Sequence, residues 1–326
     1  MAHLVETMAY VGETPWHGLG NRLSEHQPLE VWAHEAGMDW AIRETPVRFA
    51  ADHWSGGEVV KHFAEQKVLY RSDTLEPLSV VSDRYKVVQP SQILEFYRDL
   101  TELSGFELET AGVLKGGRKL WALARTGQSL TLRGKDVTHG YVLLATACDG
   151  SLATTAQLTS VRVVCNNTLQ VALNAGNGKS GTGGVVKVKH STVFDAKAVK
   201  QQLGIEVSDW ALFKDHLEAL STRKVSHTEA HRYITAVFSD PYGPPDRPPV
   251  NEKAMNRALE LFNGHGMGSM LDSAKGTAYG LLNAVTQYVD HERRARSTDN
   301  RLDSAWFGQG AVIKQKALDN ALAMLG

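Results

Sequence analysis

The chain has 326 residues, of which 42% are hydrophobic and 22% charged, a balance typical of a globular protein with a sizeable core. This length allows one large domain or two ordinary ones, and no apolar run approaches the roughly 18 residues that would span a membrane. The first residues lack the pattern of a secretory signal, and Cys148 and Cys165 can form neither a disulfide scaffold nor a metal site, so we expect a cytoplasmic protein.

Charge is strongly segregated along the chain, although the formal net charge is only −1. Residues 1–110 contain nine Lys/Arg and 18 Asp/Glu, residues 111–200 contain twelve against three, and residues 201–326 contain fourteen against fifteen. A basic segment of this size is typical of a surface that binds a polyanion, most often nucleic acid. The alternative is that the acidic first third folds back onto the segment and neutralises it.

The middle of the chain has the periodicity of strands. Residues 119–126 alternate in polarity, and residues 141–148 form a short apolar run that ends at Asp149-Gly150. Asp-Gly between two such runs is a hairpin signal, so residues 151–158 are predicted to pair back on residues 141–148.

A helix is predicted next, over residues 160–173. Its apolar residues recur at three- and four-residue spacing, and Ser160 is a suitable N-cap. The β-branched residues at 161, 163 and 164 favour a strand instead. In the helical interpretation, Arg162 lies in the first turn, where backbone N–H groups favour anions.

The second half of the chain has helical periodicity, with predicted helices at residues 197–220, 226–238, 252–263, 274–292 and 310–325. Two loops interrupt the pattern: the glycine-rich residues 174–184 and the proline-rich residues 240–250. We therefore predict an α+β fold. A β-rich core over residues 1–200, an antiparallel hairpin sheet with a packed helix in the order β-β-β-α, precedes a helical region over residues 201–326.

Two short motifs suggest chemistry that the surrounding sequence does not support. Gly178-Lys179-Ser180 lacks the glycine that a phosphate-binding loop needs five residues earlier, where Leu173 stands. His227 and His231 have a metal-binding spacing, but Ser226 and Glu229 form a capping box that explains the segment as a helix start. We expect no catalytic residues, no metal and no cofactor.

Three stretches carry a resemblance to a known family: residues 14–20 (TPWHGLG), 159–169 (TSVRVVCNNTL) and 278–291 (AYGLLNAVTQYVDH). They resemble the phage- and plasmid-borne family known as domain of unknown function 932, which implies no activity and no site residues. A more distant similarity, at the level of the expected β-β-β-α core and a basic groove, links the chain to phage single-strand annealing proteins of the lambda Beta and RecT type. That similarity implies assembly into a ring or filament.

We therefore predict a protein that binds single-stranded DNA and promotes ATP-independent annealing and recombination, self-associates and does not bind membranes. Few aromatic residues accompany the cations, so the site would hold phosphates and leave bases free to pair. The predicted phosphate contacts are Arg118, Lys119, Arg125, Arg133, Lys135, Arg162, Lys187 and Lys189. The alternatives are an interaction protein that modulates a host factor without binding DNA, and a DNA-processing enzyme with an unrecognised site.

Overall fold

The computed structural model divides the chain into two compact units. It describes residues 5–12, 20–52, 54–104, 106–164, 167–170, 185–203, 207–239 and 251–326. Unit 1 comprises residues 1–126, 142–157 and 185–204, and unit 2 comprises residues 127–141, 158–184 and 205–326. The TPWHGLG stretch at residues 14–20, apart from Gly20, and the two predicted loops, residues 174–184 and 240–250, lie outside the described residues.

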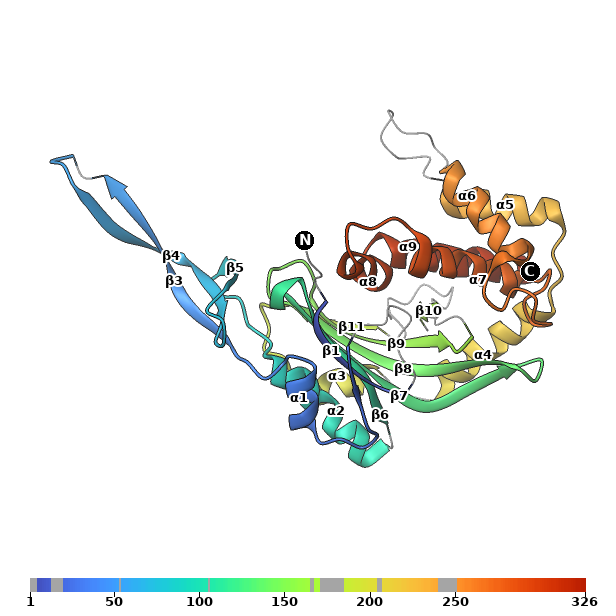
Figure 1. The fold of residues 1–326 in the computed structure, drawn as a ribbon, viewed down its shortest axis with the longest axis horizontal. Coiled ribbons are helices and arrows are strands. Elements are labelled where there is room, and N and C mark those ends of the chain that lie inside the picture. The colour runs from blue at the N-terminus through green and yellow to red at the C-terminus, as the bar shows by residue number, and fades with distance from the viewer. Residues whose placement is uncertain are drawn as a thin grey trace. The chain divides into compact units, whose positions relative to one another are not determined.

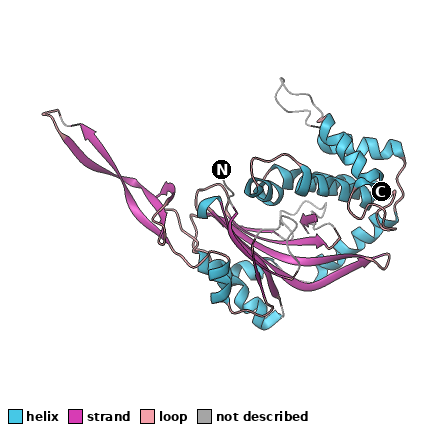
Figure 2. Cartoon of the chain, viewed as in Figure 1, coloured by secondary structure: helices cyan, strands magenta, loops and turns pink. Residues whose placement is uncertain are grey.

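The larger sheet has eight strands, seven of them in the order β10-β9-β8-β7-β6-β1-β2, with β11 also pairing with β9 (Figures 1 and 2). The strands are β1 (Val5–Val11), β2 (Asn21–Leu23), β6 (Glu107–Leu114), β7 (Lys119–Leu132), β8 (Asp136–Ala147), β9 (Thr154–Arg162), β10 (Asn167–Gln170) and β11 (Val185–Val188). The hairpin predicted around Asp149-Gly150 is confirmed, because the consecutive strands β8 and β9 are neighbours in the sheet. β7, β8 and β9 are each long enough to contribute residues to both units.

In unit 1, helix α2 (Pro90–Ser104) is anchored to the sheet by Tyr97. Proline is well placed at the first helical position, and Ile93 and Tyr97 follow at helical spacing with fully buried side chains. The Tyr97 hydroxyl lies 2.7 Å from the carbonyl oxygen of Ala122 and 3.1 Å from that of Val142. Two shorter helices, α1 (Leu29–Glu35) and α3 (Ala196–Leu203), complete this unit.

A second, three-stranded antiparallel sheet in unit 1 has the order β3-β4-β5. Its strands are β3 (Ile42–Asp52), β4 (Glu58–Arg71) and β5 (Pro77–Ser82). Because β5 pairs only with residues 66–70 of β4, the outer part of the hairpin is a two-stranded ribbon, visible in Figure 1. Phe49 and Phe63 of this ribbon are 48% and 44% exposed.

Unit 2 contains the helices of the second half of the chain: α4 (Val207–Thr222), α5 (His227–Phe238), α6 (Glu252–Glu260), α7 (Ala278–Gln287), α8 (Thr298–Phe307) and α9 (Gln309–Leu322). A π-helical turn, η3 (Tyr288–Glu292), extends α7. The α+β class and the helical C-terminal region are confirmed. The capping box is confirmed as well, since Ser226 and Glu229 exchange their hydrogen bonds at the start of α5.

The helix predicted over residues 160–173 is wrong for the described part of this segment, and residues 165–166 and 171–173 lie outside the described residues. β9 continues to Arg162, and residues 167–170 form β10, which pairs with β9 from Asn167↔Arg162 to Gln170↔Thr159. The β-branched residues of this segment favour extended backbone, and a strand buried on both faces has no polar alternation to distinguish it from a helix. The helix of the expected β-β-β-α core is therefore replaced by a fourth strand. Among the described residues, no helix combines the length and apolar character that crossing a membrane requires.

Candidate nucleic-acid interface

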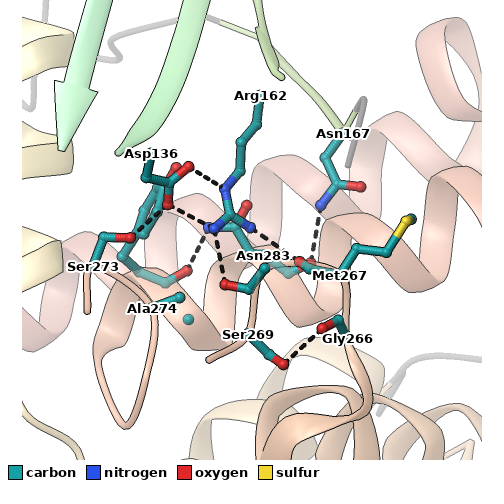
Figure 3. Close-up of polar contacts among 12 residues, drawn as sticks. Asp136, Arg162, Asn167, Gly266, Met267, Ser269, Ser273, Ala274 and Asn283 are labelled. Carbon is teal, nitrogen blue, oxygen red and sulfur yellow. Dashed lines mark hydrogen bonds and ion pairs between the residues drawn. The ribbon is translucent and has the colours of Figure 1, made fainter. Parts of the chain in front are cut away.

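Arg162, a predicted phosphate contact, is buried in unit 2 with 3% of its surface exposed, and its guanidinium points toward Asp136 (Figure 3). Its Nε donates to Asp136 Oδ1 at 2.7 Å, and its Nη2 donates to Asp136 Oδ2 at 2.6 Å. This bidentate pair is the geometry in which a guanidinium binds a carboxylate most strongly. The expected phosphate contact is corrected accordingly, because the ion-pairing edge of Arg162 is already occupied by an internal acid.

The Arg162–Asp136 pair is surrounded by further polar groups of unit 2. Ser273 donates its hydroxyl to Asp136 Oδ2 at 2.5 Å, and the backbone oxygens of Met267 and Gly268 accept from the guanidinium at 3.4 and 3.1 Å. A buried ion pair is tolerated when its remaining hydrogen-bonding positions are satisfied in this way. The arrangement ties β8 and β9 to the segment before α7, which is a structural role.

Two more predicted contacts are engaged within unit 1. Lys119 is only 5% exposed, at the start of β7. Arg125 pairs with Glu109 at 2.8 Å, on the neighbouring strand β6. Glu109 belongs to the acidic first third of the chain. In this pair, therefore, an acid of that part neutralises a cation of the basic segment, as the alternative interpretation of the charge pattern predicts.

The other five predicted contacts are exposed. Arg133 and Lys135 lie in the turn between β7 and β8, in unit 2. Arg118, Lys187 and Lys189 lie in unit 1.

The three predicted contacts exposed in unit 1 come from one end of the larger sheet. The carbonyl oxygen of Arg118, just before β7, accepts from Cys148 N, just after β8, at 2.9 Å. At the same end, Lys187 of β11 pairs with Thr155 near the start of β9. Lys189 follows β11 directly.

Arg84 and Lys86 join this group, although neither is among the contacts predicted from the sequence. The backbone N–H of Lys86 donates to the carbonyl oxygen of His190 at 2.5 Å, and His190 Nε2 lies 3.0 Å from the carbonyl oxygen of Leu152. Both cations are exposed. The signal that could have identified them is the tripeptide Arg84-Tyr85-Lys86, an aromatic residue between two cations.

We call this group the cationic sheet end: Arg84, Lys86, Arg118, Lys187 and Lys189. Asp83 and Asp149 lie on the same segments, so the balance is five cations to two acids. Such an excess on exposed side chains is the electrostatic requirement for a polyanion surface.

An aromatic pair lies among these cations. The rings of Tyr85 and His190 stack with their centroids 4.4 Å apart and an interplanar angle of 15°. The Tyr85 hydroxyl donates to the carbonyl oxygen of Ala147 at 2.7 Å. Burial is the main cause that raises the pKa of Tyr85, and the nearby Cys148 and Asp149 raise it further. The hydroxyl therefore stays protonated at neutral pH.

The stretches at residues 159–169 and 278–291, which carry the family resemblance, meet in unit 2. Asn167 donates its amide to the carbonyl oxygen of Asn283 at 3.2 Å and to Thr286 Oγ1 at 3.0 Å, and its own Oδ1 lies 3.1 Å from His291 Nε2. Asp290 accepts from the Thr168 backbone N–H at 2.7 Å. These contacts fasten β10 to α7 and its π-helical turn.

Lys314 of α9 completes this cluster. Its ammonium group lies 2.7 Å from Asp290 Oδ1 and 2.6 Å from Thr168 Oγ1. Burial lowers the pKa of Lys314, while Asp290 opposes that shift. The group joins β10, the π-helical turn and α9 through one shared carboxylate. We interpret the cluster as structural.

The rings of His227 and His231 on α5 have centroids 4.6 Å apart and are tilted by 49° relative to each other. Among the described residues, no group of three or more His, Cys, Asp or Glu side chains is arranged to hold a metal ion.

Comparison with known proteins places the chain in a family. The family model described as "Domain of unknown function (DUF932)" matches residues 77–306, which is more than two thirds of the chain. The protein belongs to this family. No curated protein and no solved structure matches the chain.

Proposed function

We propose that the protein binds single-stranded DNA through the cationic sheet end and promotes strand annealing without ATP. The observation that carries the proposal is the gathering of Arg118, Lys187 and Lys189 with Arg84 and Lys86 at one end of a sheet. Exposed Lys and Arg side chains bind phosphates and release counterions, which provides affinity without reading base sequence.

The proposed contact set differs from the one expected from sequence. Lys119, Arg125 and Arg162 are left out, because they are buried or paired. Arg133 and Lys135 remain as a second exposed pair, in unit 2.

The annealing activity is tested with two complementary fluorescent oligonucleotides whose pairing is followed by energy transfer. We expect the wild type to accelerate pairing equally with and without ATP. The variant Arg118→Glu/Lys189→Glu should lose the acceleration, whereas Lys61→Glu, an exposed cation on the β3–β4 ribbon, should retain it. An uncatalysed pairing rate with wild-type protein would overturn the proposal.

A protein-interaction module is a second candidate function, and the β3–β4 ribbon favours it. Val47 pairs with Phe63 and Ala51 with Val59, so these side chains share one face of the ribbon. A two-stranded ribbon is marginally stable alone, and exposed apolar faces are typical of protein contacts. The absence of single-strand binding at low salt would favour this candidate over the first.

A further inference from the structure

A groove in unit 1 lies beside the stacked Tyr85–His190 pair. Its volume is about 290 Å³, close to the lower end of the range for small-molecule sites. It is lined by Glu44, Lys67, Tyr85, Lys86, Val87, Gln89, Gln92, Val193 and Phe194. The cationic sheet end and the groove share Lys86.

One part of the lining is apolar and aromatic. Phe194 contacts Phe96 of α2 at a centroid distance of 6.4 Å, and Phe96 is fully buried. Val87 and Val193 extend this apolar lining, and Tyr85 adds a ring already fixed by His190 and by its hydroxyl hydrogen bond. Aromatic side chains held in place are suited to stacking on a flat ring.

The polar groups of the lining include both hydrogen-bond donors and hydrogen-bond acceptors. Gln92 Oε1 accepts from Gln89 N at 2.8 Å, and its Nε2 has no partner among the described residues. The ammonium group of Lys67 pairs with Glu44 at 2.9 Å, but the Glu44 side chain is 45% exposed and has further accepting capacity. Lys86 is exposed and unpaired among the described residues. The groove therefore offers a hydrogen-bond donor, an acceptor and a cation beside an apolar lining.

We propose that this groove takes one unstacked nucleobase of a bound single strand, with the adjacent phosphate held by Lys86. The base edge would accept from Gln92 and donate to Glu44, and its ring would stack on Phe194. This inference rests on the proposed function and deepens it. One base per subunit is held, while the remaining bases stay available for pairing.

Phe194→Leu is the central variant, because leucine keeps an apolar contact with Phe96 but removes the aromatic face. Phe49→Leu on the ribbon is the matched control. Each protein is titrated with fluorescent dT15, with an abasic strand of the same length, and with dTMP as competitor. Thermal melting of each variant establishes that it is folded.

We expect Phe194→Leu to bind dT15 about tenfold more weakly than the wild type, a loss within the range for one base–aromatic stack. Its binding of the abasic strand should be unchanged, and Phe49→Leu should match the wild type with both strands. Millimolar dTMP should displace dT15 only weakly.

Three results would overturn the inference. Equal binding of dT15 by Phe194→Leu and wild type, with weaker binding by Arg118→Glu/Lys189→Glu, would refute the groove and leave the proposed function standing. Tight binding of dTMP would make the groove a site for free nucleotides rather than for a strand. Failure of the wild type to bind dT15 at low salt would refute the proposed function itself.

Discussion

Arg162 and Asp136 lie 26 positions apart in the chain and form a bidentate ion pair that is almost completely shielded from solvent, with side-chain exposures of 3% and 1%. Arg125 is likewise paired, with Glu109. Part of the positive charge of residues 111–200 is therefore balanced within the protein. The remaining exposed cations define what a polyanion could contact.

Replacing Arg162 by alanine should destabilise unit 2 by about 3–5 kcal/mol, because Asp136 would remain buried without its cation. Lys135→Ala, an exposed cation in the nearby turn, should change stability by less than about 0.5 kcal/mol. Urea unfolding of the two variants measures the difference. A stability for Arg162→Ala within 1 kcal/mol of the wild type would contradict the structural role.

Gly117→Ala should be more destabilising than Gly134→Ala. Both glycines have positive φ, 95° and 75°, which costs an alanine about 1–2 kcal/mol. A Cβ at Gly117 would also lie 3.0 Å from the Trp40 ring, whereas one at Gly134 meets nothing within 4 Å. The crowding adds about 1–3 kcal/mol at Gly117. Equal free energies of unfolding for the two variants would show that Trp40 moves aside freely.

The stability that Glu229 contributes should depend on pH. Hydrogen bonds from the Ser226 backbone and from Arg223 lower the pKa of Glu229 from 4.5 to about 2. Since the folded-state pKa is the lower one, this contribution is complete above pH 4.5 and is lost as the pH falls toward 2. The gap in melting temperature between wild type and Glu229→Gln should therefore narrow from pH 5 to pH 3. A difference in melting temperature that stays constant over this pH range would show that Glu229 does not have the lowered pKa.

Self-association, if it follows from charge segregation, should be sensitive to salt. In that case the acidic first third of one copy would face the basic middle of the next copy, head to tail. Above about 0.5 M salt the Debye length is only a few Å, and such contacts should weaken. Sedimentation velocity at 0.05 and 0.5 M salt measures this. An oligomer unchanged by salt would indicate an apolar interface, for which the β3–β4 ribbon is the first candidate.

Local signals in the sequence predicted much of the second half of the chain. The apolar periodicity of α7, with Leu281, Leu282 and Val285 buried, and the capping box at Ser226 both appear as expected. Such features depend on residues within a few positions of each other. The same is true of the turn around Asp149-Gly150.

The site depends on contacts that no local pattern contains. Sequence alone predicts a surface cation at Arg162, because the acid that pairs with it, Asp136, lies on another strand. His190 lies far from Tyr85 in sequence, so their stack could not be inferred from either segment alone. The division of β7, β8 and β9 between the two units is likewise a property of the sheet rather than of any single strand.

The salt dependence of single-strand binding tests the central claim most directly. Binding of fluorescent dT15 is measured from 50 to 300 mM salt for the wild type, for Arg118→Gln/Lys187→Gln/Lys189→Gln, and for Lys61→Gln as control. The account predicts that the triple variant lowers the magnitude of the log–log slope by about 2, since each lost phosphate contact removes roughly 0.7. Lys61→Gln should leave the slope unchanged. A wild type that fails to bind at 50 mM salt, or a triple variant with the wild-type slope, would contradict the account.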